Sequence, residues 1–278
     1  MGNVLNSIGF YEDSAYLIAN VSNQITIVDR YTFEKKGLIR SGLNNPRYFE
    51  AIDGIGFVTN WGDPNDETDD YVAVLDVSTK TLIANIPVDF GPEKMIALGG
   101  KLYVAHKGGY GYNNVISVID TDTYEVESEI QVGDVPGSMT SDLKGNLWVL
   151  CEGIPSWTGN ETNGSLLRIR LSSNEVTLNL DFGNHNHPQF LSADMGNLYY
   201  NLNGNVYKMR DTDSELPVTE ELSGLYFYTM EVHEGMLYGT DAKDYASNGS
   251  IEIYNVTEKT YLKSIPTGII PGGIYFNN

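Results

Sequence analysis

The chain has 278 residues, and its 17 Lys and Arg against 37 Asp and Glu give a formal net charge of −20 at pH 7. Such an acidic protein is unsuited to nucleic acid, whose phosphates require Lys and Arg, and it is repelled by anionic membrane surfaces. No run of about 18 apolar residues is present, so we expect no membrane-spanning helix. The lone Cys151 excludes an internal disulfide, and we interpret it as a small buried residue.

A short motif of an aromatic residue followed by small and polar residues recurs about every 45 residues. Its copies, in chain order, are Tyr16–Asn20, Phe57–Asn60, Tyr103–His106, Trp148–Cys151, Tyr199–Asn201 and Tyr238–Asp241. We interpret each copy as the second strand of a repeated unit, with a first strand beginning about 11 residues earlier. A period of this length indicates one supersecondary unit that is stacked repeatedly.

Proline marks the start of most of the predicted first strands. These strands begin at Leu5, Pro46, Pro92, Pro136 and Pro188, near Phe227–Met230, and at Pro271. Third strands are predicted at Gln24–Asp29, Tyr71–Asp76, Val115–Asp120, Ser165–Leu171, Asn205–Arg210 and Ser250–Asn255. Fourth strands are predicted at Thr81–Val88, Glu125–Val132, Glu175–Phe182 and Thr260–Pro266. Several third strands end in Asp, whose carboxylate accepts hydrogen bonds from the amides of the following turn.

Four short strands per repeat predict the blades of an all-β β-propeller, in a single domain that spans residues 1–278. The chain holds six full repeats and a seventh first strand, Gly272–Asn278, that has no partner strands of its own. We expect a seven-bladed propeller whose missing strands lie upstream of Met1 in a longer protein. The alternative is a six-bladed propeller in which the last strand is docked irregularly.

The connections at the two ends of the predicted blades differ in length. The loops from second to third strands are long, as in 60–70, 106–114, 151–164 and 240–249, whereas the opposite connections are tight hairpins. Long loops on one side of a rigid scaffold commonly carry function, and aromatic residues among Asn and Gly make an adaptable binding surface. The predicted ligand-binding residues at this end are Asn60, Trp61, His106, Tyr110, Tyr112, Glu152, Trp157, His185, His187, Asp241 and Tyr245.

Signals for metals and catalysis are weaker. The Asp63–Asp70 loop spaces its carboxylates as calcium loops do, but it lacks the Gly and the final Glu of an EF-hand. His185 and His187 lie two residues apart, and on an extended segment they would point to opposite sides. Two alternatives remain. Calcium could bind in the Asp63–Asp70 loop, or a divalent ion could bind to His185 and His187 together with His106. The sequence contains no nucleophile elbow, phosphate loop or dinucleotide fingerprint, so nucleophilic catalysis has no support. We predict no metal, no cofactor and no catalytic residue.

The motif Phe57-Val58-Thr59-Asn60 and its copies resemble the YVTN repeat of YncE-like propellers along essentially the whole chain. Ser7–Asp29, together with Gly42–Tyr48, is similar to the DUF5074-type surface propellers of Bacteroidetes, often described as surface layer proteins. That group includes the BtuG-type lipoproteins that capture vitamin B12. The resemblance implies an extracellular, outer-membrane-anchored protein that passes a corrinoid to an outer-membrane transporter. It implies no particular ligand-binding residue.

Three functions are compatible with this sequence. A non-catalytic corrinoid-binding protein fits best, since a broad ring fringed with amides suits loops that combine aromatic and amide side chains. A surface-layer module that binds a protein or a glycan would use the same loops. A metal-dependent lactonase would need a divalent ion with open coordination positions, near the ends of second strands where Asn60, His106, Glu152 and Asp241 lie.

Overall fold

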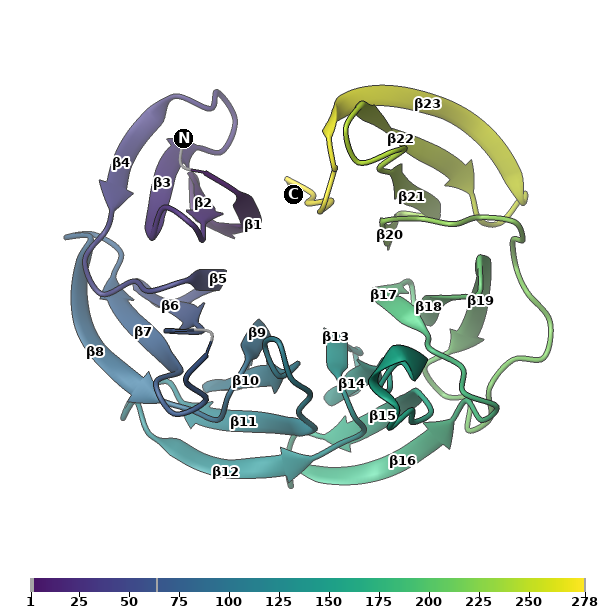
Figure 1. The fold of residues 1–278 in the computed structure, drawn as a ribbon, viewed down its shortest axis with the longest axis horizontal. Coiled ribbons are helices and arrows are strands. Elements are labelled where there is room, and N and C mark those ends of the chain that lie inside the picture. The colour runs from purple at the N-terminus through teal and green to yellow at the C-terminus, as the bar shows by residue number, and fades with distance from the viewer. Residues whose placement is uncertain (1–2, 64, 278) are drawn as a thin grey trace. The chain divides into compact units, whose positions relative to one another are not determined.

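The computed structural model of the protein describes residues 3–63 and 65–277, which form 23 strands and one short 3-10 helix, η1 (Ser156–Thr158). The strands build six antiparallel sheets, and within each sheet neighbouring strands follow the order of the chain (Figure 1). The described residues group into two compact units, Met1–Pro136 with Tyr275–Asn278, and Gly137–Ile274. No helix among them is long and apolar enough to cross a membrane.

The first unit holds three four-stranded blades. The first blade consists of β1 (Leu5–Tyr11), β2 (Ser14–Ala19), β3 (Gln24–Asp29) and β4 (Lys35–Ile39). The second blade consists of β5 (Pro46–Ile52), β6 (Ile55–Asn60), β7 (Tyr71–Asp76) and β8 (Thr81–Pro87). The third blade consists of β9 (Pro92–Leu98), β10 (Lys101–His106), β11 (Val115–Asp120) and β12 (Val126–Gln131).

The second unit holds two four-stranded blades and one with three strands. The fourth blade consists of β13 (Pro136–Ser141), β14 (Asn146–Cys151), β15 (Ser165–Arg170) and β16 (Glu175–Asp181). The fifth consists of β17 (Gln189–Asp194), β18 (Asn197–Leu202) and β19 (Asn205–Arg210). The sixth consists of β20 (Thr229–His233), β21 (Met236–Asp241), β22 (Asn248–Asn255) and β23 (Thr260–Ile269).

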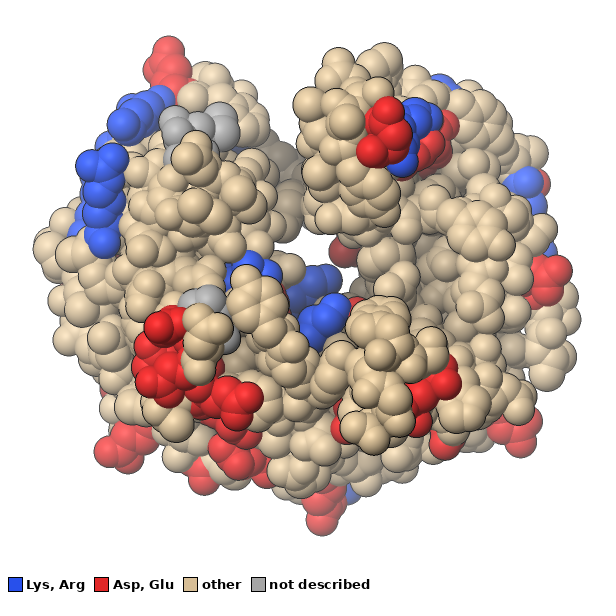
Figure 2. Space-filling model, viewed as in Figure 1, with Lys and Arg blue, Asp and Glu red and all other residues tan. Residues whose placement is uncertain are grey.

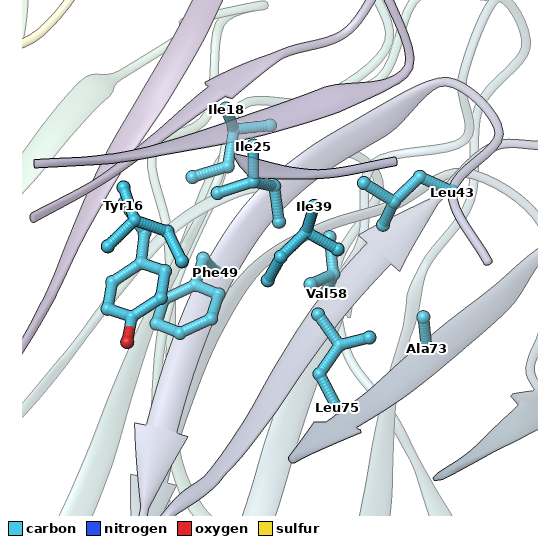
Figure 3. Close-up of a cluster of buried hydrophobic side chains, with 10 residues drawn as sticks. Tyr16, Ile18, Ile25, Ile39, Leu43, Phe49, Val58, Ala73 and Leu75 are labelled. Carbon is cyan, nitrogen blue, oxygen red and sulfur yellow. The ribbon is translucent and has the colours of Figure 1, made fainter. Parts of the chain in front are cut away.

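The hydrophobic core lies between adjacent blades, because a blade has two apolar faces and each must pack on a neighbour. Figure 3 shows this contact between the first two blades, where Tyr16 and Phe49 stack with ring centroids 4.1 Å apart. Gly9 makes the close approach possible, since a Cβ there would lie 2.6 Å from the Phe49 ring. Burial of each such large side chain stabilises the fold by roughly 1.5–3 kcal/mol.

The hairpins also follow from the sequence. Asp53 and Gly54 join β5 to β6 with φ angles of 49° and 82°, both positive, as a type I′ turn requires. Asp29 Oδ1 accepts hydrogen bonds from the amides of Tyr31 and Thr32 at 3.0 and 2.9 Å, and so closes the turn after β3. The role predicted for the Asp residues that end third strands is therefore confirmed here.

The fifth blade departs from the four-stranded pattern. After β19 the chain forms a single isolated bridge, Val206 to Leu222, where a fourth strand would lie. No fourth strand was predicted in this segment either. Several apolar side chains of this connection, including Leu222 and Leu225, still pack against the core of the second unit.

The structure has six blades, and the expectation of seven is wrong for the described residues. Residues 271–277 of the predicted seventh first strand form no strand, and Asn278 lies outside the described residues. The physical reason is that a first strand needs a second strand to pair with, and every second strand among the described residues is already paired within its own blade. Instead the Asn277 side chain donates a hydrogen bond to the Arg30 carbonyl at 3.1 Å and accepts one from the Arg30 guanidinium.

We predict that Phe49→Ala lowers the free energy of unfolding by about 3–5 kcal/mol, because it removes the stacked ring and leaves a cavity between the first two blades. Urea denaturation would measure this loss. Val21→Ala, at a side chain that is 66% exposed, is the matched control and should change stability by less than about 0.5 kcal/mol. Equal effects of the two substitutions would contradict this account of the core.

Candidate functional site

Most of the predicted ligand-binding residues lie at or after the ends of second strands, His185 and His187 lie in the connection from β16 to β17, and together they form three local groups. Five of them are in the first unit: Asn60, Trp61, His106, Tyr110 and Tyr112. Four surround the loops after β14 and β16 in the second unit: Glu152, Trp157, His185 and His187. Asp241 is the last residue of β21, and Tyr245 lies in the loop that follows, where it packs edge-to-face on Tyr228 with ring centroids 5.8 Å apart.

Trp61 is held on three sides in the first unit. Its indole Nε1–H donates a hydrogen bond of 3.0 Å to the Pro92 carbonyl, and the Arg47 guanidinium lies 3.9 Å from the ring centroid. Tyr110 contacts it edge-to-face with ring centroids 5.9 Å apart. The indole is therefore fixed before any ligand arrives, while the Tyr110 side chain above it is 79% exposed.

A pocket of about 230 Å³ opens beside this aromatic pair. Its walls combine aromatic rings, carboxylates and a glycine-rich backbone, and its lining residues are Trp61, Asn65, Asp66, Glu67, Asp70, Phe90, Gly91 and 108–111. All of these residues belong to the first unit.

Asp70 is the most perturbed carboxylate of this pocket. The residue is 5% exposed, its Oδ2 accepts a hydrogen bond from the Gly91 amide at 3.2 Å, and its Oδ1 has no hydrogen-bond partner among the described residues. Burial raises the pKa of Asp70 to about 7, and the negative charges of Asp69, Asp89 and Asp66 add to the shift. The group therefore exchanges its proton near neutral pH.

Arg47 forms a buried ion pair with Glu93 beneath Trp61. Its Nη2 and Nε lie 2.8 and 3.1 Å from Glu93 Oε1. Burial raises the pKa of Glu93 in spite of Arg47, Lys107 and Lys94, which favour the charged form. The pair joins β5 to β9 and fixes the guanidinium that supports the indole.

Two of the predicted binding residues are closed to a ligand. Asn60 is fully buried, and its side chain accepts from the Asn44 amide at 3.0 Å and donates to the Val58 carbonyl at 2.8 Å. His106 is also fully buried, between Ser117 Oγ at 2.9 Å and the Phe90 carbonyl at 3.3 Å. Burial lowers the pKa of His106 to about 4, so its ring is neutral at physiological pH. Both side chains therefore hold the loops in place through these hydrogen bonds and are not available to a ligand.

His185 and His187 do not point to opposite sides, as an extended segment would require. Asn184 and His185 have positive φ angles of 49° and 53°, so the segment turns. Both rings face Glu161, with His185 Nδ1 at 3.4 Å from Oε2 and His187 Nε2 at 3.2 Å from Oε1. Among the described residues, no three His, Cys, Asp or Glu are arranged to hold a metal ion.

The remaining predicted residues occupy the loops in different ways. Trp157 lies on η1 and is 83% exposed. Glu152 follows β14 and lies over Gly137, where a Cβ would meet the carboxylate at 2.0 Å. Asp241 forms an ion pair of 2.5 Å with Lys243, which lowers the pKa of Asp241.

Sequence reasoning missed Arg47, Glu93, Glu161 and Tyr228, and it noted Asp70 only as part of an acidic loop. Arg47 and Glu93 lie 46 residues apart, one repeat period, in neighbouring first strands. This one-period spacing could have predicted that the two residues lie close together, because corresponding positions of adjacent first strands lie side by side. Glu161 and Tyr228 have no comparable signal, since the loops that carry them are irregular.

No family model matches this chain, and no curated protein matches it in sequence. Solved structures with a similar fold include Kuenenia stuttgartiensis hydrazine synthase, with a TM-score of 0.67 and 17% identity over 94% of this chain and 85% of that one. The computationally designed Ika8 protein has a TM-score of 0.67 and 9% identity over 94% and 74% of the two chains. BamB from Moraxella catarrhalis has a TM-score of 0.62 and 13% identity over 96% and 75%.

These similarities, together with the six sheets, define the fold as a six-bladed β-propeller. At such low identities they define the fold alone, because one fold supports many functions. The function has to be argued from the residues of the loops.

We predict that Asp70→Asn stabilises the protein at about pH 8 by about 1 kcal/mol or more. The folded state keeps the Asp70 proton up to pH about 7, whereas the unfolded chain releases it near its ordinary pKa. Wild-type stability therefore falls as the pH rises between these two values, and the full penalty is present above the higher one. Asp70→Asn has an amide in place of this carboxyl, so its stability does not fall with pH for this reason.

Thermal unfolding of both proteins from about pH 4 to about pH 8 would measure the difference, which should be small at the acidic end. Glu50, whose pKa burial raises to about 7, is present in both proteins and cancels in the comparison. A difference that does not change with pH would contradict the assignment to Asp70.

We predict that Arg47→Met destabilises the fold by about 3 kcal/mol, since it leaves the Glu93 carboxylate buried without its partner. The double substitution Arg47→Met with Glu93→Met should recover most of that loss, because two apolar side chains replace two desolvated charges. Denaturant unfolding of the single and double variants measures the loss of stability in the first and its recovery in the second. If the double variant is no more stable than the single one, the unpaired Glu93 carboxylate is not the cause of the destabilisation by Arg47→Met.

Proposed function

We propose that this protein is a non-catalytic binding protein that captures a bulky ligand with the long loops of its blades, most concretely a corrinoid such as vitamin B12. In this proposal it works at the cell surface and passes the ligand to an outer-membrane transporter. The ligand class, the location and the partner follow from the resemblance of Ser7–Asp29 and Gly42–Tyr48 to the vitamin B12-capturing surface propellers.

The observation that carries the proposal is the exposure of aromatic rings on the loops that follow second strands. Tyr110, Trp157 and Tyr245 are 79%, 83% and 60% exposed. Tyr110 rests on the fixed indole of Trp61, and Tyr245 rests on Tyr228. Rings that are already supported lose little conformational entropy on binding, which favours tight capture of a large flat ligand.

A surface-layer module that binds a protein or a glycan is the alternative, and the same exposed rings support it. Aromatic residues are enriched at the centres of protein interfaces, so these loops would serve a protein partner equally well. A lactonase-like enzyme is the less favoured alternative, and it would require a divalent ion held by carboxylates or histidines near the ends of second strands.

Calorimetric titration with cyanocobalamin tests the proposal. We expect one corrinoid bound per chain, and we expect Tyr110→Ala or Trp157→Ala to weaken binding by about 2 kcal/mol, or roughly thirtyfold, if that ring is a central anchor. Trp61→Ala is a poorer test, because it also removes the packing on Arg47.

Tyr31→Ala is the matched control. Tyr31 is 63% exposed in the same unit, but it lies in the hairpin between β3 and β4, at the other end of its blade. Its loss should leave corrinoid binding unchanged. If the folded wild-type protein shows no binding by calorimetry or by equilibrium dialysis, the corrinoid is excluded and a protein or glycan partner becomes the leading hypothesis.

A further inference from the structure

We propose that the pocket bordered by Asp70, Trp61 and Tyr110 binds an organic ammonium group, such as the side chain of a lysine or a free primary amine. This inference does not depend on the corrinoid, because it concerns the charge and the unmet hydrogen-bonding capacity of one pocket within the first unit.

The first argument is a buried acceptor without a donor. Asp70 Oδ1 is shielded from water and has no hydrogen-bond partner among the described residues, although the carboxylate borders the pocket. The other oxygen, Oδ2, accepts a hydrogen bond from the Gly91 amide. Leaving a buried acceptor unsatisfied is costly, and a charged donor that enters from the pocket would remove the cost.

The second argument is the charge around that acceptor. Asp66 and Glu67 line the same pocket, and Asp69 and Asp89 lie close enough to raise the pKa of Asp70. Figure 2 shows acidic side chains gathered over this part of the second and third blades. None of these five carboxylates forms an ion pair with another described residue, so the site attracts a cation that the chain does not supply.

The third argument is the shape and nature of the walls. Trp61, Phe90 and Tyr110 offer aromatic surface to an alkyl stem. The Arg47 guanidinium already covers one face of the Trp61 indole, so we expect the ammonium group to lie toward Asp70 and away from that face. Gly91 and Gly108 form the other wall with φ angles of +67° and +96°. A Cβ on either would lie within 2.5 Å of the neighbouring backbone, so the close approach of these loop segments requires glycine at both positions.

These walls favour an organic cation over calcium, the alternative that the acidic loop raises. Calcium takes about six to eight oxygen ligands. Among the described residues no three carboxylates or histidines surround a common point, and aromatic rings occupy part of the pocket wall. One ammonium group needs far fewer partners, and Asp70 with its acidic neighbours supplies them.

The test uses n-butylammonium chloride as the probe and 1-butanol as its uncharged counterpart. The chain has three Trp residues, so a ¹H–¹⁵N spectrum contains three indole N–H signals, and Trp61→Phe identifies the one from the pocket. At about pH 8, where Asp70 is ionised, we expect n-butylammonium to shift the Trp61 signal to saturation in the millimolar range. The signals of buried Trp148 and of Trp157 on η1 should stay in place.

Asp70→Asn is the decisive variant, and we expect it to weaken n-butylammonium binding by about tenfold or more, the loss typical of a hydrogen bond to a charged group. Asp122→Asn is the matched control, an exposed Asp in the β11–β12 hairpin of the same unit, and it should bind like the wild type. Equal shifts with 1-butanol would overturn the proposal, as would unchanged binding by folded Asp70→Asn. Saturation by CaCl₂ with no response to n-butylammonium would also overturn it, in favour of an inorganic cation.

Discussion

The packing of one blade on the next is the interaction on which everything else in this protein depends. A four-stranded sheet has two apolar faces, and in each unit the middle strands become buried because a neighbouring blade covers them. The contact between Tyr16 and Phe49 shows how close this approach is. Because the strands are fixed in this way, the loops at their ends are held from both sides and can carry exposed aromatic rings without collapsing onto the core.

Burial also controls the electrostatics of the candidate site. It is the largest cause of the raised pKa values of Glu50, Asp70 and Glu93 and of the lowered pKa of His106. In each case burial favours the uncharged form of the group, and among these four groups Glu93 is the one with an ion-pair partner in the described part of the chain. These buried groups beneath the loops therefore carry less charge than a count of their Asp, Glu and His residues implies. The negative charge of the chain lies mainly on exposed carboxylates. This contrast is compatible with exposed aromatic rings on the loops of so acidic a protein.

Most of the fold could be predicted from the sequence, because each blade repeats the same local pattern. The third strands β3, β7, β11 and β19 have the predicted bounds, and β5, β9 and β13 begin at the predicted prolines. The predicted number of blades was wrong. A sequence pattern can suggest a first strand at Gly272, but it does not show whether a second strand is available to pair with it. The candidate site was less predictable. Sequence located the loops, but burial of Asn60 and His106, and the turn that brings His185 and His187 to Glu161, depend on contacts that no periodicity encodes.

The three-stranded fifth blade has a consequence for how the protein opens. The long connection from β19 to β20 is joined to its blade by the bridge between Val206 and Leu222 and by a few nearby backbone bonds, whereas β23 is paired along most of its length. Backbone amides of this connection are thus released by small, local fluctuations, without separation of the blades. We expect the amides of this connection to exchange hydrogen sooner than those of the paired strands of the second unit, so that this unit shows two levels of protection in its native state.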